Sequence, residues 1–209
     1  MTKGLLITFE GGEGAGKSTQ IEMVEDFLRR QGREVLVLRE PGGTPIGEAI
    51  RTILLSCKHG NMSPRSELLL YEAARAQLVD EVICPALDNG TVVLCDRFFD
   101  STIAYQGQGR AIDLAWIDRL NIFATNGLAP DCTVVIDISP AVGLRRASPG
   151  ATPDRLESAD ESFHEAVREG FLNLAARYPR RVRIVEGDRQ PVQVFEDIKR
   201  IAEEALARV

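Results

Sequence analysis

Short apolar runs alternate along the chain with longer stretches in which apolar residues recur every three or four positions. The runs are nearly continuous, as is typical of strands that are covered on both faces in a parallel sheet. We expect such strands at 4–9, 34–38, 91–95, 132–138 and 182–185. Helices are expected between the first strand and Gly32, at about 45–55, from Pro64, at 140–147 and from about Pro191. Strands that alternate with helices predict an α/β fold, in which helices flank both faces of a parallel sheet.

One segment, 145–154, breaks this alternation. It mixes Arg, Ser, Pro and Gly and shows no apolar period. After it, Ser158 and Glu161 have the spacing of a capping box, which predicts that another helix begins there. We interpret about 145–157 as a mobile lid, although the composition is equally typical of an ordinary surface loop. The 209 residues are otherwise interpreted as one domain.

Charge and composition argue against several classes of protein. A net charge of −6 at pH 7 is unlike that of proteins that coat nucleic acid or anionic membranes, because those surfaces are met by basic patches. The sequence has no run of about 18 apolar residues and no basic N-terminal segment followed by an apolar run. Four widely spaced cysteines form no CxxC pair, so neither a zinc site nor a disulfide framework is indicated. We therefore expect a cytoplasmic protein that binds neither nucleic acid nor a membrane.

The residues between the first strand and the first helix match the phosphate-binding pattern GxxxxGK(S/T). In such a loop the backbone N–H groups surround a phosphate, and the dipole of the following helix adds to their attraction. Lys17 would reach the phosphoryl group that is transferred, and Ser18 would offer its hydroxyl to Mg²⁺. The predicted loop consists of Gly11, Gly12, Glu13, Gly14, Ala15, Gly16, Lys17 and Ser18. A chance glycine-rich turn is the alternative, but the strand-loop-helix context favours a site for a nucleoside triphosphate with Mg²⁺.

The end of the third strand helps to distinguish between classes of phosphate-loop protein. Asp96 would lie at the carboxyl edge of the sheet, where it can hold Mg²⁺ or its waters. The next residue is Arg97, whereas a motor ATPase would need a glutamate there to activate water. A cation at this position favours binding of a second phosphate group, and Arg75 and Arg39 are further candidates, because arginine binds phosphate bidentately and stays charged. For each arginine, a solvated or ion-paired side chain is the alternative.

The sequence offers no plausible general base, and an anionic acceptor needs none. A phosphate monoester already carries its nucleophilic oxygen, so transfer to it depends on alignment and charge neutralisation. His59 and His164 are far from every motif and are interpreted as surface residues. A nucleotide-dependent switch is the competing class, but its motifs NKxD and DxxG do not occur in the sequence. A kinase that acts on a phosphate-bearing acceptor is therefore favoured.

Five motifs together resemble those of the bacterial thymidylate kinases, a family of P-loop nucleoside monophosphate kinases. They are FEGGEGAGKST at 9–19, REPGGT at 39–44, YEAARAQ at 71–77, DRFFDSTIAYQG at 96–107 and DRLE at 154–157. The resemblance covers most of the chain and implies a three-layer P-loop NTPase fold with a five-stranded parallel sheet, and a homodimer formed through helices. It also implies transfer of the γ-phosphoryl group of Mg·ATP to dTMP, giving dTDP and ADP in dTTP biosynthesis. Another nucleoside monophosphate or a small acid is the alternative acceptor.

The resemblance implies roles for individual residues of the acceptor site. Glu13 would reach the 3′-hydroxyl of the acceptor sugar, and Arg97 and Arg75 would bind the thymidylate phosphate and its surroundings. Tyr71 would lie against the thymine ring, and Tyr105 would crowd the 2′ position so that a ribose fits poorly. The implied dTMP-binding set is completed by Arg39, Thr102 and Gln106, the last two near the polar edge of the base. For the two tyrosines, ordinary core packing is the alternative.

On the donor side, the resemblance adds Thr19 and the arginines of the lid to the ATP-binding residues. Arg155, helped by Arg145 or Arg146, would approach the donor phosphates when the lid closes and would stabilise the transition state. Some relatives carry this arginine in the glycine loop, where this chain has Gly14 and Ala15 instead. The implied metal ligands are Ser18, Asp96 and Glu157, and the implied catalytic residues are Lys17, Arg97, Arg155 and Glu13.

Two positions depart from the family pattern. Phe98 stands where relatives usually have tyrosine or histidine, which removes a polar group next to Arg97. Leu156 is aliphatic where some relatives present a tyrosine, so any contact made by that tyrosine is absent here.

Overall fold

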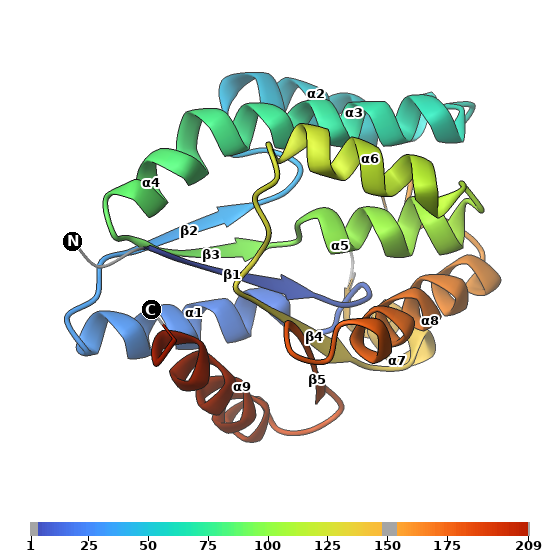
Figure 1. Ribbon diagram of the computed structural model, residues 1–209. Helices are drawn as coiled ribbons and strands as arrows, with labels where there is room; N and C mark the ends of the chain where they lie inside the picture. The colour runs from blue at the N-terminus through green and yellow to red at the C-terminus, as the bar shows by residue number, and fades with distance from the viewer. Residues whose placement is uncertain (1–3, 148–153, 209) are drawn as a thin grey trace.

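The computed structural model describes residues 4–147 and 154–208, which form a five-stranded parallel sheet flanked by helices (Figure 1). The strands are β1 (Leu5–Glu10), β2 (Val35–Arg39), β3 (Val92–Asp96), β4 (Cys132–Asp137) and β5 (Val182–Glu186). They are hydrogen-bonded in the order β2-β3-β1-β4-β5, and each neighbouring pair is parallel. The α/β fold is confirmed, and each predicted strand lies within one residue of its observed bounds.

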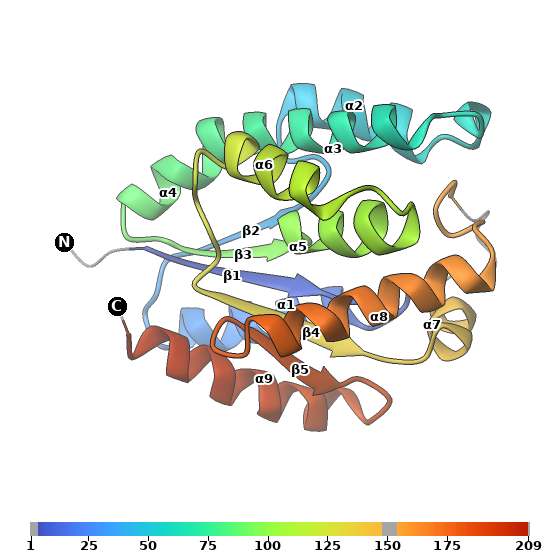
Figure 2. The same cartoon turned by 45° about the vertical axis from the view of Figure 1, so that its right-hand side comes forward.

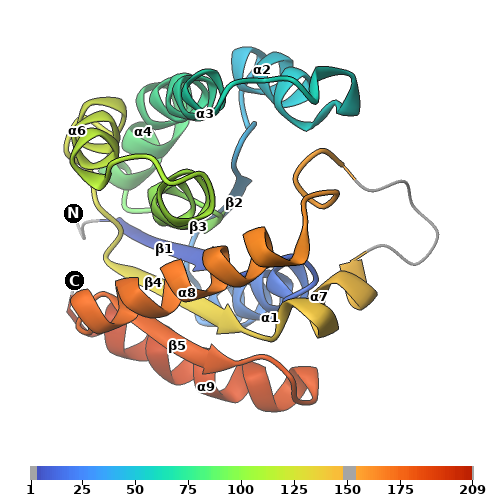
Figure 3. The same cartoon turned by 90° about the vertical axis from the view of Figure 1, so that its right-hand side faces the viewer.

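Helices cover both faces of this sheet. They are α1 (Lys17–Arg30), α2 (Pro45–Leu55), α3 (Pro64–Leu78), α4 (Cys84–Asp88), α5 (Phe99–Thr102), α6 (Leu114–Ala124), α7 (Pro140–Ala147), α8 (Glu161–Arg177) and α9 (Pro191–Leu206), with a 3₁₀ turn η1 (Cys57–His59) and π-helical turns η2 (Val79–Ile83) and η3 (Ile103–Gly109). Figures 2 and 3 show α1 and α9 on one side of the sheet and α3, α4 and α8 on the other. Helices α2 and α6 pack beside α3, on opposite sides of it in Figure 3. Among the described residues, no helix has both the length and the apolar character needed to cross a membrane.

The side chains of β1 point alternately to the two faces of the sheet and so contribute to two layers of the core. Ile7 packs with Val24 of α1 and Ile198 of α9 on one face of the sheet, whereas Leu6 belongs to the cluster on the opposite face. Because successive side chains of a strand point to opposite faces, Glu10 lies on the same face as Leu6. The last side chain of β1 is therefore a buried carboxyl group directed toward α5.

The segment between β3 and β4 contains helical structure, although its apolar residues follow no clear helical period. It forms α5, the π-helical turn η3 and α6. The turn η3 lies so close to α8 that a Cβ on Gly170 would come within 2.9 Å of the Ala104 Cα atom. Short π-helical segments displace the usual helical register and are frequent at functional sites. This one carries Tyr105 and Gln106, two of the predicted site residues.

Two predictions about the region around α8 are wrong. The helix begins at Glu161 with Asp160 as its N-cap, and the Asp160 carboxylate accepts a hydrogen bond from the Phe163 N–H group (2.8 Å). Ser158 instead donates its hydroxyl to the Asp154 carbonyl (2.6 Å), because aspartate directly before the helix is at least as good a cap as serine. His164 is buried against Phe163 on the inward side of α8, not on the surface. The surface position predicted for His59 is confirmed.

Candidate active site

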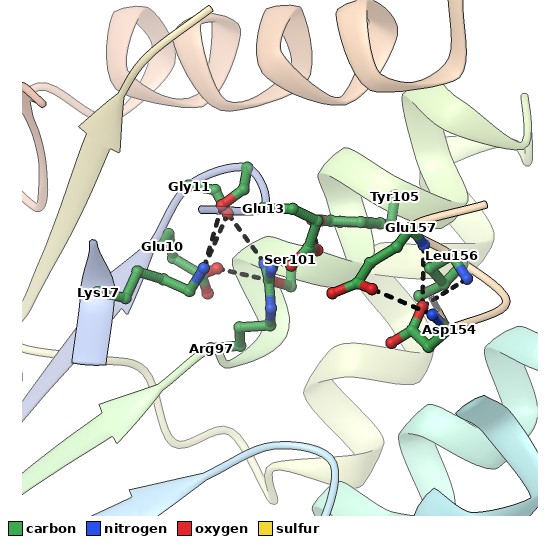
Figure 4. Close-up of polar contacts among 11 residues, drawn as sticks. Glu10, Gly11, Glu13, Lys17, Arg97, Ser101, Tyr105, Asp154, Leu156 and Glu157 are labelled. Atoms are coloured by element: carbon green, nitrogen blue, oxygen red, sulfur yellow. Dashed lines mark hydrogen bonds and ion pairs between the residues drawn. The ribbon is translucent and has the colours of Figure 1, made fainter. Parts of the chain in front are cut away.

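The loop between β1 and α1 has the backbone of a phosphate cradle. Gly11 and Gly14 have φ angles of 136° and 64°, and a Cβ at Gly14 would lie 2.1 Å from the Gly143 carbonyl oxygen, so a side chain at either position would strain the loop. Helix α1 begins directly after the loop and turns its unpaired first N–H groups toward it. Lys17 folds back over the loop, where its Nζ donates to the carbonyl oxygens of Gly11 (3.4 Å) and Gly12 (3.2 Å) (Figure 4).

A cavity of about 450 Å³ extends from this loop across the carboxyl edge of the sheet, which is where open α/β sheets bind ligands. Most of the predicted site residues line it: Glu13, Gly14, Ala15, Gly16, Lys17, Ser18, Thr19, Arg39, Tyr71, Asp96, Arg97, Thr102, Tyr105, Gln106, Arg146 and Glu157. The predicted residues outside this lining are Gly11, Gly12, Arg75, Arg145 and Arg155. One cavity thus joins the phosphate loop to Tyr71 and Gln106.

Arg97 lies within this cavity, close to the phosphate loop. Its Nη2 donates to Glu13 Oε1 (2.7 Å), and the same oxygen accepts from the Tyr105 hydroxyl (2.8 Å). Its Nη1 donates to the Gly11 carbonyl (3.0 Å) and to the Ser101 hydroxyl (3.3 Å), as Figure 4 shows in part. Burial alone would raise the pKa of Glu13, but the neighbouring Arg97 charge holds it at about 2. The cluster is therefore an ion pair with a guanidinium group that faces the cavity.

Glu10, which the sequence analysis did not single out, supports the backbone around Arg97. Its Oε1 accepts from the Phe98 N–H group (2.8 Å) and its Oε2 from the Ser101 hydroxyl (2.6 Å). Arg97 itself has a φ of 69°, a conformation that residues other than glycine rarely adopt. Burial, followed by the charge of Asp100, raises the pKa of Glu10 to about 8. A glutamate that ends an otherwise apolar strand was the only sequence signal for this role.

Asp96 at the end of β3 has a buried oxygen without a partner among the described residues. Its Oδ1 accepts no hydrogen bond from them, which is unusual for a buried polar atom. Ser18 and Glu157 line the same cavity. A Mg²⁺ ion in nucleotide sites takes one or two carboxylates together with phosphate oxygens, so Asp96 and Ser18 fit a magnesium ion that shares its ligands with a phosphate. Within the described parts of the chain, no group of three or more His, Cys, Asp or Glu side chains is arranged to hold a metal.

Arg75 is fully buried behind the cavity wall. Its guanidinium pairs with Glu40 (2.7 Å) and Glu72 (2.9 Å), and its Nη1 also donates to the Thr102 hydroxyl (2.9 Å) and to Asn121 (3.3 Å). Burial disfavours its charge, but the two carboxylates raise the pKa of Arg75 above its ordinary value. In this structure Arg75 therefore reaches the cavity indirectly, through Thr102 and Glu40, which both line it.

Several lining residues were missed as site residues, although most lie inside the quoted motifs. They are Glu40, Pro41, Arg51, Leu55, Ser101, Ala147, Asp154 and Leu156. Leu156, one of the two departures from the family pattern, is buried in a cluster with Tyr105 and Phe163. Phe98, the other departure, is buried under the Arg75 guanidinium, 5.6 Å from it. Both departures therefore contribute apolar packing beside the cavity.

The three lid arginines have different surroundings. Arg145 and Arg146 are both exposed, but Arg146 lines the cavity and pairs with Asp188 (2.5 Å), whereas Arg145 does not line it. Arg155 donates from Nε to the Leu54 carbonyl (2.8 Å) and from Nη1 to Glu67 (2.5 Å), so it is held against the ends of α2 and α3. Residues 148–153 of the predicted lid lie outside the described residues.

Comparisons with known proteins point to one family. The family model for thymidylate kinase matches residues 9–198. Thymidylate kinases from Deinococcus radiodurans and an Exiguobacterium species are 49% and 47% identical to the chain, over 90% and 93% of its length and 91% of theirs. A crystal structure of thymidylate kinase from Ehrlichia chaffeensis superposes with a TM-score of 0.80 at 31% identity, covering 96% of this chain and 99% of that one. The chain therefore belongs to the thymidylate kinase family, whose members are ATP-dependent nucleoside monophosphate kinases.

Proposed function

We propose that the cavity binds Mg·ATP at the phosphate loop and dTMP at the end formed by Tyr71 and Gln106. The enzyme then transfers the γ-phosphoryl group to dTMP and releases dTDP and ADP, a step in the synthesis of dTTP. The observation that carries this proposal is the position of Arg97, a cation in a cavity that is continuous from the loop to Tyr71. A cation there neutralises the two phosphate groups that must approach each other.

On the donor side, the loop from Gly11 to Thr19 surrounds the β-phosphate with backbone N–H groups. Lys17 leaves the carbonyl oxygens of the loop and binds the γ-phosphate, because phosphate is a stronger partner for an ammonium group than a neutral carbonyl. Ser18 and Asp96, with Glu157 from the lining of the same cavity, would hold Mg²⁺, which supplies charge neutralisation to the phosphates. The unpartnered Asp96 oxygen is the observation that supports this metal site.

On the acceptor side, Arg97 binds the dTMP phosphate, and Arg39 lines the cavity as a second cation. Glu13 accepts from Arg97 and Tyr105 and retains lone pairs for the 3′-hydroxyl of the sugar. Tyr105, fixed by Glu13, leaves little room for a 2′-hydroxyl group. Transfer needs no proton-removing residue, since the phosphate oxygen of dTMP is already the nucleophile.

The thymine ring lies against Tyr71, with Thr102 and Gln106 at its polar edge. Arg75 acts on this end of the cavity through Thr102, to which it donates a hydrogen bond. Among the lid arginines, Arg146 lines the cavity and would approach the donor phosphates. For Arg155 to stabilise the transition state, its bond to Glu67 would have to break.

We also propose a homodimer formed through α3 and α6. Helix α6 exposes Trp116 (60%), Ile122 (64%) and Phe123 (83%), and the adjoining α3 exposes Leu69 (55%). Apolar side chains gathered on neighbouring helices mark protein interfaces. Sedimentation equilibrium should report a dimer for the native protein and a monomer for Phe123→Glu; a native monomer would contradict the proposal.

A cytoplasmic location fits the proposed substrates. None of the four cysteines, all of which lie within the described residues, forms a disulfide, which suits a reducing compartment.

Replacement of Arg97 tests the proposed function. We expect Arg97→Ala to lower the rate of dTDP formation by about 10²- to 10³-fold while the dissociation constant for ATP, measured by calorimetry, stays within about twofold. The matched control is Arg30→Ala, which removes an exposed arginine of α1. An equal loss of ATP affinity would contradict the acceptor role. The native protein should also release ADP only when dTMP is present; equal ADP release without dTMP, or equal turnover of dCMP, would contradict the proposed reaction.

A further inference from the structure

A buried carboxylate on α3 joins three segments beside the acceptor end of the cavity. Glu67 is 1% exposed and lies one helical turn before Tyr71. Its Oε2 accepts from Arg155 Nη1 (2.5 Å) and Arg110 Nη2 (3.3 Å), and its Oε1 accepts from Arg110 Nε (3.2 Å) and Gln106 Nε2 (2.9 Å). The bond to Gln106 is the one that reaches a residue of the cavity lining.

This bond fixes which end of the Gln106 amide faces the cavity. An ionised carboxylate only accepts hydrogen bonds, so the amide must turn its NH₂ group toward Glu67. Burial would raise the pKa of Glu67, but the hydrogen bonds from Gln106, Arg110 and Arg155 lower it, so the carboxylate stays ionised. The amide oxygen of Gln106 is then the atom left for a ligand in the cavity. Without Glu67, the amide could rotate by half a turn and present its NH₂ group instead.

We propose that Glu67 is a specificity-determining positioning residue, which makes Gln106 present a hydrogen-bond acceptor to the base of the substrate. Thymine carries an N–H group at N3, whereas the corresponding nitrogen of cytosine is an acceptor. A fixed acceptor on the protein therefore favours thymine and uracil and leaves two acceptors facing each other when cytosine is bound. This inference rests on the proposed position of the base beside Gln106.

The Glu67→Gln variant tests the inference, because it keeps the shape of the side chain but lets the Gln106 amide adopt either orientation. The ratio of dissociation constants for dCMP and dTMP, measured by calorimetry or by competition, should fall about tenfold or more. The ratio for dUMP and dTMP should stay within about twofold, since both bases carry the N–H group. A purely structural defect would change both ratios or neither.

Two further variants separate the role of Gln106 from that of the charge. Arg110→Gln removes another partner of Glu67 but leaves Glu67 and Gln106 paired, so the dCMP/dTMP ratio should change by less than about twofold. Gln106→Leu should lower that ratio by itself, and the addition of Glu67→Gln should then have no further effect. A further fall of the dCMP/dTMP ratio in the double variant would overturn the inference, as would an unchanged ratio in a folded Glu67→Gln protein. If Gln106→Leu leaves the ratio unchanged, the proposed position of the base fails as well.

A measurement on the native protein does not depend on how these variants fold. The side-chain NH₂ signal of Gln106, assigned by its absence in Gln106→Leu, should show slow hydrogen exchange both before and after dTMP is added. An NH₂ signal that becomes protected only when dTMP binds would show that this group contacts the base, and would overturn the inference.

Discussion

The donor and acceptor halves of the cavity use different parts of the chain to meet anions. The donor half is backbone: a loop of consecutive residues whose conformation depends on Gly11 and Gly14, followed by the first turn of α1. The acceptor half is made of buried side chains from separate segments, joined by ion pairs such as Arg75 with Glu40. Backbone N–H groups bind phosphate without burying a protein charge, whereas each buried arginine of the acceptor half needs a carboxylate partner.

Because of this difference, substitutions in the two halves should affect the reaction rate and the stability of the protein differently. A side chain that extends from the donor loop can be changed while the loop keeps its shape, because glycine conformations and the helix hold it. A side chain of the acceptor half cannot be removed without leaving its partner buried and unpaired. We therefore expect substitutions in the donor half to affect mainly rate, and substitutions in the acceptor half to affect stability as well.

The largest effect is expected for Lys17→Met. The variant keeps most of the side-chain volume but removes the charge that meets the transferred phosphoryl group, so kcat should fall by about 10³-fold. The midpoint of urea unfolding should change little, because the bonds that Nζ makes within the described residues are two long ones to loop carbonyls. The control is Lys58→Met at an exposed position. A large loss of stability would mean that Lys17 holds the loop together and would remove the contrast between the two halves.

Arg75→Met should give the next largest effect, which is a loss of stability. Glu40 and Glu72 would be left buried without their cation, at a cost of about 3 kcal/mol in the free energy of unfolding. Arg183→Met, which breaks the exposed pair with Glu204, should cost less than about 0.5 kcal/mol. Urea unfolding monitored by circular dichroism measures both. If the two variants lose similar amounts, the acceptor half is not held together by its buried ion pairs.

The same contrast explains what the sequence could predict. The strands, the phosphate loop and the Asp96–Arg97 pair are contiguous patterns with a local physical cause, and the structure contains each of them. The ion pairs of the acceptor half join residues that are distant in the chain: Arg75 and Glu40 are 35 positions apart, and Arg155 and Glu67 are 88 apart. Nothing in a single sequence records which arginine meets which carboxylate.

Arg75 and Arg155 illustrate this limit. The family resemblance named both as residues that meet phosphate, but their surroundings depend on Glu40, Glu72 and Glu67, none of which was singled out from the sequence. Those roles of the two arginines stay predictions. The π-helical turn η3 was also missed, because a π-helical register does not follow the spacing of an α-helix.

The smallest of the three effects concerns Glu10, which lies where the two halves meet. It is the last residue of β1, directly before the loop, but it binds Phe98 and Ser101 on the acceptor side. Its pKa in the folded protein is about 8, above the ordinary value of 4.5, so the folded state holds a proton that the unfolded state loses. The contribution of Glu10 to stability is therefore complete below about pH 4.5 and is lost as the pH rises toward 8.

Glu10→Gln removes this titration but retains a side chain that can bond to the Phe98 N–H group and to Ser101. Between pH 5 and pH 7 the free energy of unfolding of the native protein should fall relative to that of the variant by about 2 kcal/mol. Urea unfolding at several pH values measures this difference, and the comparison with the variant cancels the titration of Glu40 and other groups. Parallel pH profiles would mean that Glu10 is ionised throughout this range. In that case the Glu10 carboxylate would be charged and balanced by Arg97, like the other buried carboxylates of the acceptor half. The acceptor half would then include the last residue of β1.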